Sequence, residues 1–595
     1  MKFTMRPDGR TPSMTEPNHA EWETWLEKWF IPLLIPAILV NAGGLFIPIL
    51  EPDGSLYATI AKTIARSGDF IHLYVDGKAW LDKPHFPFWM AALSFRVLGV
   101  NAFAYKFPAL LFWAAGAFYT WRLALSLYGK PVAQLATLIY VSAAHLVISN
   151  NDVRAEPYLT GLIIGAVYHF YKASRANQTA GSSGEGSWLW HIIAGSFLSA
   201  CACMTKGPFV LITIGAGFIV DWVWGREWEQ FRHIRWWLAI ALTGIFMLPE
   251  LICLYLQFDK HPELLVFGHT GVSGIRFFFW DSQFGRFFNT GPIKGSGDPF
   301  FYFHTLLWAF LPWSLLLYAA ILRRPRRSVP GDLICLGGAL ASFLIFSLSR
   351  FQLPHYLNIL FPFFSILTAG YLYTDHRRVI RKTIRIVQDT INVLLPILLL
   401  LLCWFFHFNG WPLLLVLIVV LAILPFALFR TPALSSPIAR SFWMSIMVFA
   451  FINFIVYPAI LQYQAGTQAG RYLETHPELT AAPSAASMLP PAVAAAESPV
   501  AYLLLEAPAS FSFEFDAPGT VARVPIDSLP HPLPTGGILV FAPTTFADSL
   551  TAKGYNAAPL QHFDYFHISQ LTGPFINYRT RAGVLTPWEL YRVTR

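Results

Sequence analysis

Charged side chains are scarce in this chain. Of its 595 residues only 13% are Asp, Glu, Lys or Arg, whereas soluble domains carry about 25%. Hydrophobic residues make up 55%, and the mean hydropathy is +0.49. So few charges cannot cover the surface of several soluble domains. The composition therefore excludes a soluble multidomain protein and indicates one that crosses a membrane many times.

Cysteine is also rare, and its placement excludes a disulfide framework in the C-terminal region. All five cysteines lie in apolar stretches: Cys201, Cys203, Cys253, Cys335 and Cys403. None follows residue 403, so disulfides cannot stabilise the last third of the chain. Residues 1–29 are polar and contain no short apolar core before a small-residue cleavage site. A cleaved signal peptide is therefore not expected, and the first span should remain as an anchor.

Long apolar runs, in contrast, are abundant. A bilayer core is crossed by about 20 apolar residues in a helix. Runs of that length predict about thirteen spans. They lie near residues 31–50, 102–120, 131–149, 157–173, 188–204, 208–224, 236–256, 300–321, 332–348, 355–373, 390–408, 411–429 and 442–463.

The basic residues lie mostly on one side of these spans. Loops on that side carry Arg122 and Lys130, Lys172 and Arg175, Arg226, Arg232 and Arg235, Arg323, Arg324, Arg326 and Arg327, five residues in 377–385, and Arg430 and Arg440. The short loops opposite carry one basic residue or none. The positive-inside rule places the basic loops and the N-terminus in the cytoplasm, and an odd span count places the C-terminus outside. Topology thus explains the net charge of +8, and nucleic-acid binding is not expected.

Four regions follow from this arrangement. Residues 1–30 form a cytoplasmic segment, 31–463 a helical membrane domain, 464–499 a connecting helix and linker, and 500–595 a small outer α/β domain. Strands are predicted in the last region at Ala501–Glu506, Phe511–Phe515, Thr520–Val524, Gly537–Ala542 and Trp588–Val593, with a helix at Thr544–Lys553.

Two outward loops are long, 51–101 and 257–299. The first contains an amphipathic helix that ends at Gly68 and is expected to lie in the membrane interface rather than to cross it. Its apolar face consists of Leu56, Tyr57, Ile60, Ala61 and Ile64.

Charged residues in the outward loops are the candidates for chemistry. Asp53, at the exit of the first span, either caps the following helix or acts in a reaction, and the two roles are compatible. Lys83 either reaches toward lipid phosphates or binds the phosphate of a substrate. Arg154 either neutralises Asp152 or Glu156, or stands beside the acidic wall of a polar cavity.

A further set of cations is scattered along the chain: Lys206, Arg276, Arg286 and Arg350. Each alone is an ordinary interface anchor. Together with Lys83 they would form a positively charged outward cavity, which suits a phosphate or pyrophosphate.

The order of several short motifs resembles that of the aminoarabinose transferase and protein mannosyltransferase families, over roughly residues 30–375. The motifs are Glu51-Pro52-Asp53 with Tyr57-Ala58, Ser67-Gly68-Asp69-Phe70, Asp82-Lys83-Pro84 before aromatic residues, Arg154 with Glu156, Thr205-Lys206-Gly207-Pro208, Arg286-Phe287, Pro312-Trp313, Ser347-Leu348-Ser349-Arg350, and Leu353-Pro354 with Tyr356. The bacterial aminoarabinose transferase-like branch, which also has a small outer C-terminal domain, is the nearer of the two.

The resemblance implies the C-type glycosyltransferase membrane fold, with interfacial helices in the first outer loop, in a bacterial cytoplasmic (inner) membrane. It implies transfer of a sugar from a polyprenyl-phosphate donor to lipid A, a protein hydroxyl or another glycan. The protein is then surrounded by membrane lipids. The resemblance assigns no cofactor and no metal ligand, and it leaves open the binding of a divalent metal ion.

Site roles follow as expectations. Asp53 and Glu156 are the candidate catalytic acids. Lys83, Lys206 and Arg286, assisted by Arg276 and Arg350, would bind the donor phosphate. The sugar and acceptor pocket would contain Tyr57, Asp82, His85, Asp152 and Tyr356.

Two departures from the family pattern bear on the identity of the substrates. The usual Asp-Glu pair is Asp53-Gly54 here, and Glu156 stands where aspartate is common.

A polymerase or ligase that uses a pyrophosphate-linked donor is the nearest alternative function. A multispan transporter or flippase, or a structural subunit, is the alternative from another class. A transporter would place charges near the bilayer midplane, whereas the charges here gather at one face.

Overall fold

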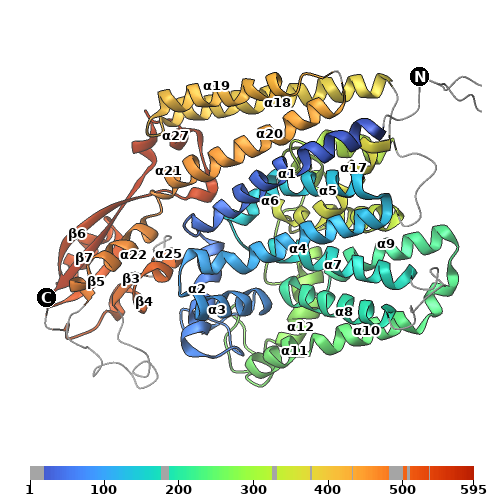
Figure 1. The fold of residues 1–595 in the computed structure, drawn as a ribbon. Coiled ribbons are helices and arrows are strands. Elements are labelled where there is room, and N and C mark those ends of the chain that lie inside the picture. The colour runs from blue at the N-terminus through green and yellow to red at the C-terminus, as the bar shows by residue number, and fades with distance from the viewer. Residues whose placement is uncertain are drawn as a thin grey trace, which may run out of the picture.

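A helical domain carries a small sheet domain at its C-terminal end (Figure 1). The computed structural model describes residues 19–175, 187–323, 332–374, 378–431, 433–480, 500–504, 510–534 and 536–595. Most of the predicted cytoplasmic segment 1–30 and the linker residues 481–499 therefore lie outside the described residues, and the division into four regions stays a prediction.

Every predicted span coincides with a helix or with a run of broken helices. Within the described ranges, eight helices are long and apolar enough to cross a membrane, or nine if the bent pair α5 (Lys130–Ser142) and α6 (Ala144–Asn151) is one span. Helices α9 (Val210–Gly225) and α16 (Asp332–Leu348) are apolar but only 16 and 17 residues long. The protein is thus a multispan membrane protein, and the count of thirteen stays a prediction.

Helix α7 (Glu156–Arg175) lies in the centre of the helical domain, packed between α4 (Ala102–Tyr128) and α8 (Ser187–Lys206). Glycine makes this approach possible, because a Cβ on Gly161 would lie 2.1 Å from the Phe112 carbonyl oxygen. Helix α8 ends at Lys206, where Gly207 takes a φ of 108°. The packing therefore brings the first residue of α7 and the last residue of α8 together.

The amphipathic helix predicted in the first outer loop is confirmed as α2 (Asp53–Ser67). Tyr57, Ile60, Ala61 and Ile64 are buried, and Gly68 ends the helix in the left-handed conformation, with a φ of 77°. The chain then passes through β1 (Tyr74–Val75) and β2 (Lys78–Ala79) to α3 (Phe86–Leu98), which packs against α2.

The second outer loop and the next spans complete the helical domain. Their elements are α10 (Ile234–Phe246), α11 (Leu248–Leu254), α12 (Gly274–Arg276), the π-helical turn η5 (Phe277–Gly285), α13 (Arg286–Phe288), α14 (Phe301–Ala309), α15 (Ser314–Leu322), η6 (Pro354–Leu360), α17 (Phe361–Thr374), α18 (Arg378–Phe406), α19 (Trp411–Leu428), α20 (Ser435–Phe451) and α21 (Tyr457–Leu461).

The C-terminal domain has a five-stranded mixed sheet in the order β4-β3-β5-β7-β6. The strands are β3 (Ala501–Leu504), β4 (Val521–Val524), β5 (Ile538–Pro543), β6 (Asn556–Tyr565) and β7 (Thr586–Thr594). Strand β3 is parallel to β4 and β5, whereas β7 is antiparallel to β5 and β6. Helices α22 (Ala465–Thr475), α25 (Ser510–Asp516) and α26 (Phe546–Ala552) accompany it.

One predicted strand is wrong. Residues 511–515 alternate Phe, Ser, Phe, Glu and Phe, which is a strand pattern, but they form helix α25. The helix is favoured because it has two neighbours: Phe513 packs on Phe541 of the sheet, and Phe515 packs on Phe95 of α3. Strand β6, whose side chains are mostly exposed, was not predicted because its sequence lacks a clear apolar alternation.

Candidate functional site

A polar cavity of about 170 Å³ lies where α2, α7, α8 and the second outer loop meet. Four cationic side chains and three carboxylates line it. The lining residues are Asp53, Tyr57, Asp82, Lys83, Arg154, Ala155, Glu156, Lys206, Arg286, Ile293, Phe351, Leu353, His355 and Tyr356. Residues separated by up to 300 positions in the sequence are thus brought into one hollow.

Asp53 is the first residue of α2, and its carboxylate contacts Arg154. Arg154 Nη1 donates to Asp53 Oδ2 at 2.6 Å, and Arg154 Nη2 lies 2.9 Å from Asp152 Oδ2. The expected pairing of Arg154 with Asp152 is therefore confirmed, and Asp53 shares the same guanidinium. Pro52 occupies the N-cap position, and no side-chain capping bond forms there.

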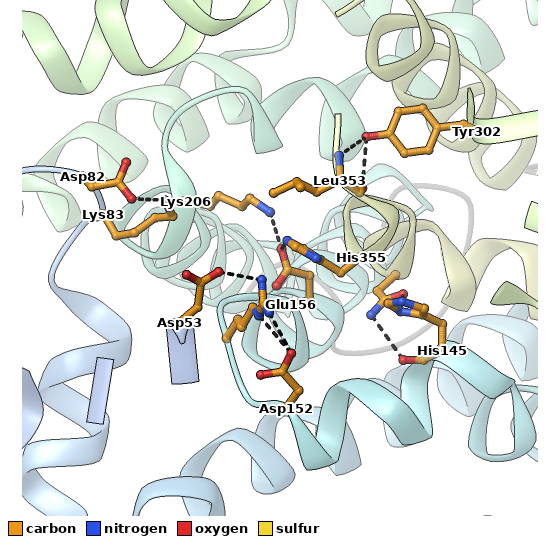
Figure 2. A network of polar contacts seen from close by, with 12 residues as sticks. Asp53, Asp82, Lys83, His145, Asp152, Glu156, Lys206, Tyr302, Leu353 and His355 are labelled. Atoms are coloured by element: carbon orange, nitrogen blue, oxygen red, sulfur yellow. Dashed lines mark hydrogen bonds and ion pairs between the residues drawn. The ribbon is translucent and has the colours of Figure 1, made fainter. Parts of the chain in front are cut away.

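Glu156 and Lys206 form an ion pair across the inner end of the cavity (Figure 2). Both side chains are nearly inaccessible to solvent, at 2% and 8%. The Lys206 ammonium also lies over the Tyr356 ring, 3.7 Å from its centroid, and His355 Nε2 is 3.8 Å from Glu156 Oε1. A charged pair this deep is stable only because each charge has a partner.

Asp82 bridges two cations, since both Lys83 and Arg286 donate to its carboxylate. Burial would raise the pKa of Asp82, but Lys83 and Arg286 outweigh it and hold that pKa below its usual value. Burial lowers the pKa of Lys83 in spite of the opposite effect of Asp82. Arg286 stacks over Phe351, 5.5 Å from the ring centroid, which fixes the direction of its guanidinium.

Each cation that lines the cavity already contacts a carboxylate. The site therefore does not consist of one acid facing a cluster of free cations. An anionic ligand would instead have to replace a carboxylate as the partner of Lys83, Lys206 or Arg286. This replacement needs little reorganisation of the chain, because the positions of the three cations are already fixed. Such a preorganised set suits a phosphate group, whose oxygens accept several charge-assisted hydrogen bonds.

Four residues predicted for the site lie outside the cavity lining. Arg276 is 74% exposed, with Nε 3.6 Å from Asp281, and Arg350 is also exposed. His85 is buried against α11, where its Nδ1 lies 3.0 Å from Glu250 Oε1. Asp152 stands behind Arg154. Nothing in these positions supports direct contact with a substrate in the cavity.

His355, Phe351 and Leu353 line the cavity but were not predicted as site residues. Phe351 and Leu353 lie in the irregular stretch that precedes η6, where neighbouring side chains do not follow a helical or strand period, and His355 lies in the first turn of η6. The sequence predicts Arg350 and Tyr356, on either side of these three residues, as site residues. No pattern in the sequence shows which residues between them line the cavity. Among the described residues, no group of three or more His, Cys, Asp and Glu side chains could hold a metal ion.

The chain is similar in sequence to several known proteins. Residues 51–266 match the family model of dolichyl-phosphate-mannose-protein mannosyltransferase. The undecaprenyl phosphate-alpha-4-amino-4-deoxy-L-arabinose arabinosyl transferase of Edwardsiella ictaluri is 28% identical over 54% of this chain and 55% of its own length. A protein of the same name from Pseudomonas fluorescens is 25% identical over 56% of both chains. The chain thus spans about half the length of these relatives.

The fold matches a solved structure over almost the whole chain. The crystal structure of ArnT from Cupriavidus metallidurans bound to undecaprenyl phosphate aligns with a TM-score of 0.67 and 17% identity, and the match covers 95% of this chain and 98% of that one. The fold is therefore the membrane fold of the C-type glycosyltransferases, with a small sheet domain attached. In sequence, the chain is similar to the aminoarabinose transferases over about half of its length and to the protein mannosyltransferase family over residues 51–266.

Proposed function

We propose that this protein transfers a sugar from a polyprenyl-phosphate donor to an acceptor, at the outer face of a bacterial cytoplasmic membrane. The observation that carries the proposal is the cavity in which Lys83, Lys206 and Arg286, from three distant segments, surround a space that Asp53 also lines. The relatives named above, one solved with undecaprenyl phosphate, support the same donor class.

The reaction is a single displacement. An acceptor hydroxyl oxygen attacks the anomeric carbon, the bond from that carbon to the phosphate oxygen breaks, and the electron pair leaves with the phosphate. The three cations stabilise the charge that develops on this leaving group, and a single such donor is typically worth about 10²–10³ in rate. One displacement inverts the anomeric configuration.

Asp53 accepts the proton of the acceptor hydroxyl. Its carboxylate is 40% exposed and contacts Arg154 through Oδ2, so it is reachable from the cavity and held in one direction by the guanidinium. A base in a fixed position contributes typically about 10²–10⁴ in rate. Glu156 has a supporting role, because its pairing with Lys206 fixes that lysine beside the donor phosphate.

The orientation follows from the basic loops: the N-terminus lies in the cytoplasm, and the C-terminal domain lies outside. The acceptor is lipid A, a protein hydroxyl or another glycan. A pyrophosphate-linked donor, as used by a polymerase or ligase, is the second candidate for the same cations. A transporter or flippase is disfavoured because the charges converge on one cavity beside the outer loops.

The test is a transfer assay in vesicles that contain the purified chain. Labelled sugar on a polyprenyl monophosphate should move to lipid A or protein acceptors, and unlabelled monophosphate lipid should compete better than pyrophosphate lipid. Mass spectrometry of lipid A and envelope glycoproteins from cells with and without the chain identifies the product. If no labelled donor yields product with any of these acceptors, the proposed function is wrong.

A further inference from the structure

Helix α25 of the C-terminal domain lies directly against α2, the helix that begins with Asp53 (Figure 1). Helix α25 also makes an apolar contact with the neighbouring helix α3, since the Phe515 ring lies 5.9 Å from that of Phe95. The contact between α25 and α2 itself is polar, because Thr59 of α2 donates to the Phe511 carbonyl oxygen at 3.3 Å. The two elements are more than 440 residues apart in the sequence, so this contact joins the domain to the site.

Lys62 is the strongest link in this contact. Its side chain is buried, yet no carboxylate of the described residues forms an ion pair with it. Its ammonium donates instead to three backbone carbonyls at the C-terminal end of α25, those of Glu514 at 2.7 Å, Phe515 at 2.9 Å and Ala517 at 3.1 Å. All three ammonium protons are thus used, on the carbonyl groups that a helix end leaves unpaired.

A second link holds the chain just before Asp53. The Glu51 backbone N–H donates to Gln464 Oε1 at 3.0 Å, and Gln464 Nε2 donates to the Ile49 carbonyl at 3.0 Å. Ser512 of α25 donates its hydroxyl to Glu51 Oε1. Glu51, Gln464 and Ser512 are all buried, so the turn that leads into α2 is bound from the C-terminal side.

These two links lie on either side of Asp53. Glu51 is two residues before it, and Lys62 is about two and a half helical turns after it. Undocking α25 would break the three hydrogen bonds of the Lys62 ammonium and the hydrogen bond from Ser512 to Glu51, and would separate Phe515 from Phe95. The domain is therefore held in one position relative to α2.

We propose that the C-terminal domain is a positioning element for Asp53, which acts by clamping α2 at Glu51 and Lys62. The proposal rests on the proposed function, in which Asp53 is the base. Lys62 and Glu51 are positioning residues, because they act through α2 and do not line the cavity. The clamp matters because a displacement of about 1 Å at a reacting group can lower a rate about 100-fold.

The test compares Lys62→Met with Arg66→Met, an exposed cation on the same helix. Lys62→Met should lower the turnover number about 10- to 100-fold, while binding of polyprenyl phosphate stays at the wild-type level, because the phosphate-binding cations are not on α2. Amide hydrogen exchange across residues 53–67 should become faster. Arg66→Met should change none of these. Lys62→Arg should recover part of the turnover, because it keeps a donor at the end of α25.

Ser512→Ala gives a milder second variant in case Lys62→Met does not fold. It should lower turnover less and leave polyprenyl phosphate binding unchanged, with faster exchange at residues 53–55. Wild-type turnover and wild-type exchange in both folded variants would overturn the clamp. A failure of the proposed function is recognised separately, because the wild-type protein would then transfer no sugar while the exchange measurement would still report on the clamp.

Discussion

The guanidinium of Arg154 binds two carboxylates at once, with Nη1 2.6 Å from Asp53 Oδ2 and Nη2 2.9 Å from Asp152 Oδ2. Asp53 lies at the start of α2, and Arg154 lies in the short loop before α7. The pair therefore also joins two segments that are far apart in the sequence. The arginine holds the Asp53 carboxylate in one direction where it lines the cavity, and a base needs such a fixed position.

Replacement of Arg154 by lysine should therefore lower the rate of transfer. A lysine keeps the charge but cannot present the fork of donors that reaches both carboxylates. We expect turnover to fall about 10- to 100-fold with little change in donor affinity, measured by steady-state transfer in vesicles. Asp152→Asn, which leaves the contact between Arg154 and Asp53, is the matched control and should have a smaller effect. Equal turnover of Arg154→Lys and wild type would argue against this role.

Lys83→Ala should both slow transfer and raise the donor concentration needed for half-maximal rate. Its ammonium lines the cavity beside Arg286, and the loss of one fixed electrostatic donor typically costs about 10²–10³ in rate. Arg276→Ala removes an exposed cation outside the cavity and should leave both quantities unchanged. An unchanged donor dependence in Lys83→Ala would remove this lysine from the phosphate site.

The pair of Glu156 and Lys206 should show strong coupling in stability. Glu156→Ala leaves a buried ammonium without its partner, and the expected loss is about 3–5 kcal/mol in the free energy of unfolding. The double variant Glu156→Ala with Lys206→Met should be less destabilised than the sum of the single variants Glu156→Ala and Lys206→Met. Thermal unfolding in detergent measures this cycle, and strict additivity would mean that the two side chains do not interact.

Glu51 should make the stability depend on pH. Burial raises its pKa from 4.5 to about 7, so the protonated form is favoured in the folded protein. The stability that this form provides is complete below about pH 4.5, and it declines as the pH rises toward 7, because the unfolded chain ionises first. Glu51→Gln cannot ionise. The unfolding temperature of the wild type, taken relative to Glu51→Gln, should therefore fall between pH 5 and pH 8, whereas parallel curves would contradict this account.

The sequence predicted most of the membrane fold because long apolar runs and the amphipathic pattern of residues 56–64 are local signals. It also predicted Asp53, Lys83, Glu156, Lys206 and Arg286, all of which line one cavity. The motif order indicated that these residues belong together, but only the packing of α2, α7, α8 and the outer loops shows how close they lie.

The errors have a common physical origin. Helix α25 alternates like a strand and becomes a helix because it packs between the sheet and α3. Arg276 and Arg350 are basic residues in outward loops, but they are exposed and do not line the cavity. His355 lies in it, beside residues that were recognised. In each case tertiary packing decided the outcome, and no pattern within a short window of sequence could have shown it.

The most direct measurement is the transfer rate of Asp53→Asn in vesicles supplied with labelled donor lipid. The amide keeps the size of the side chain and can still accept from Arg154, so the protein should fold, insert and bind polyprenyl phosphate as the wild type does. It cannot take the acceptor proton, and we predict that sugar transfer is abolished. Near-normal transfer by this variant would contradict the central claim that Asp53 is the base of the reaction.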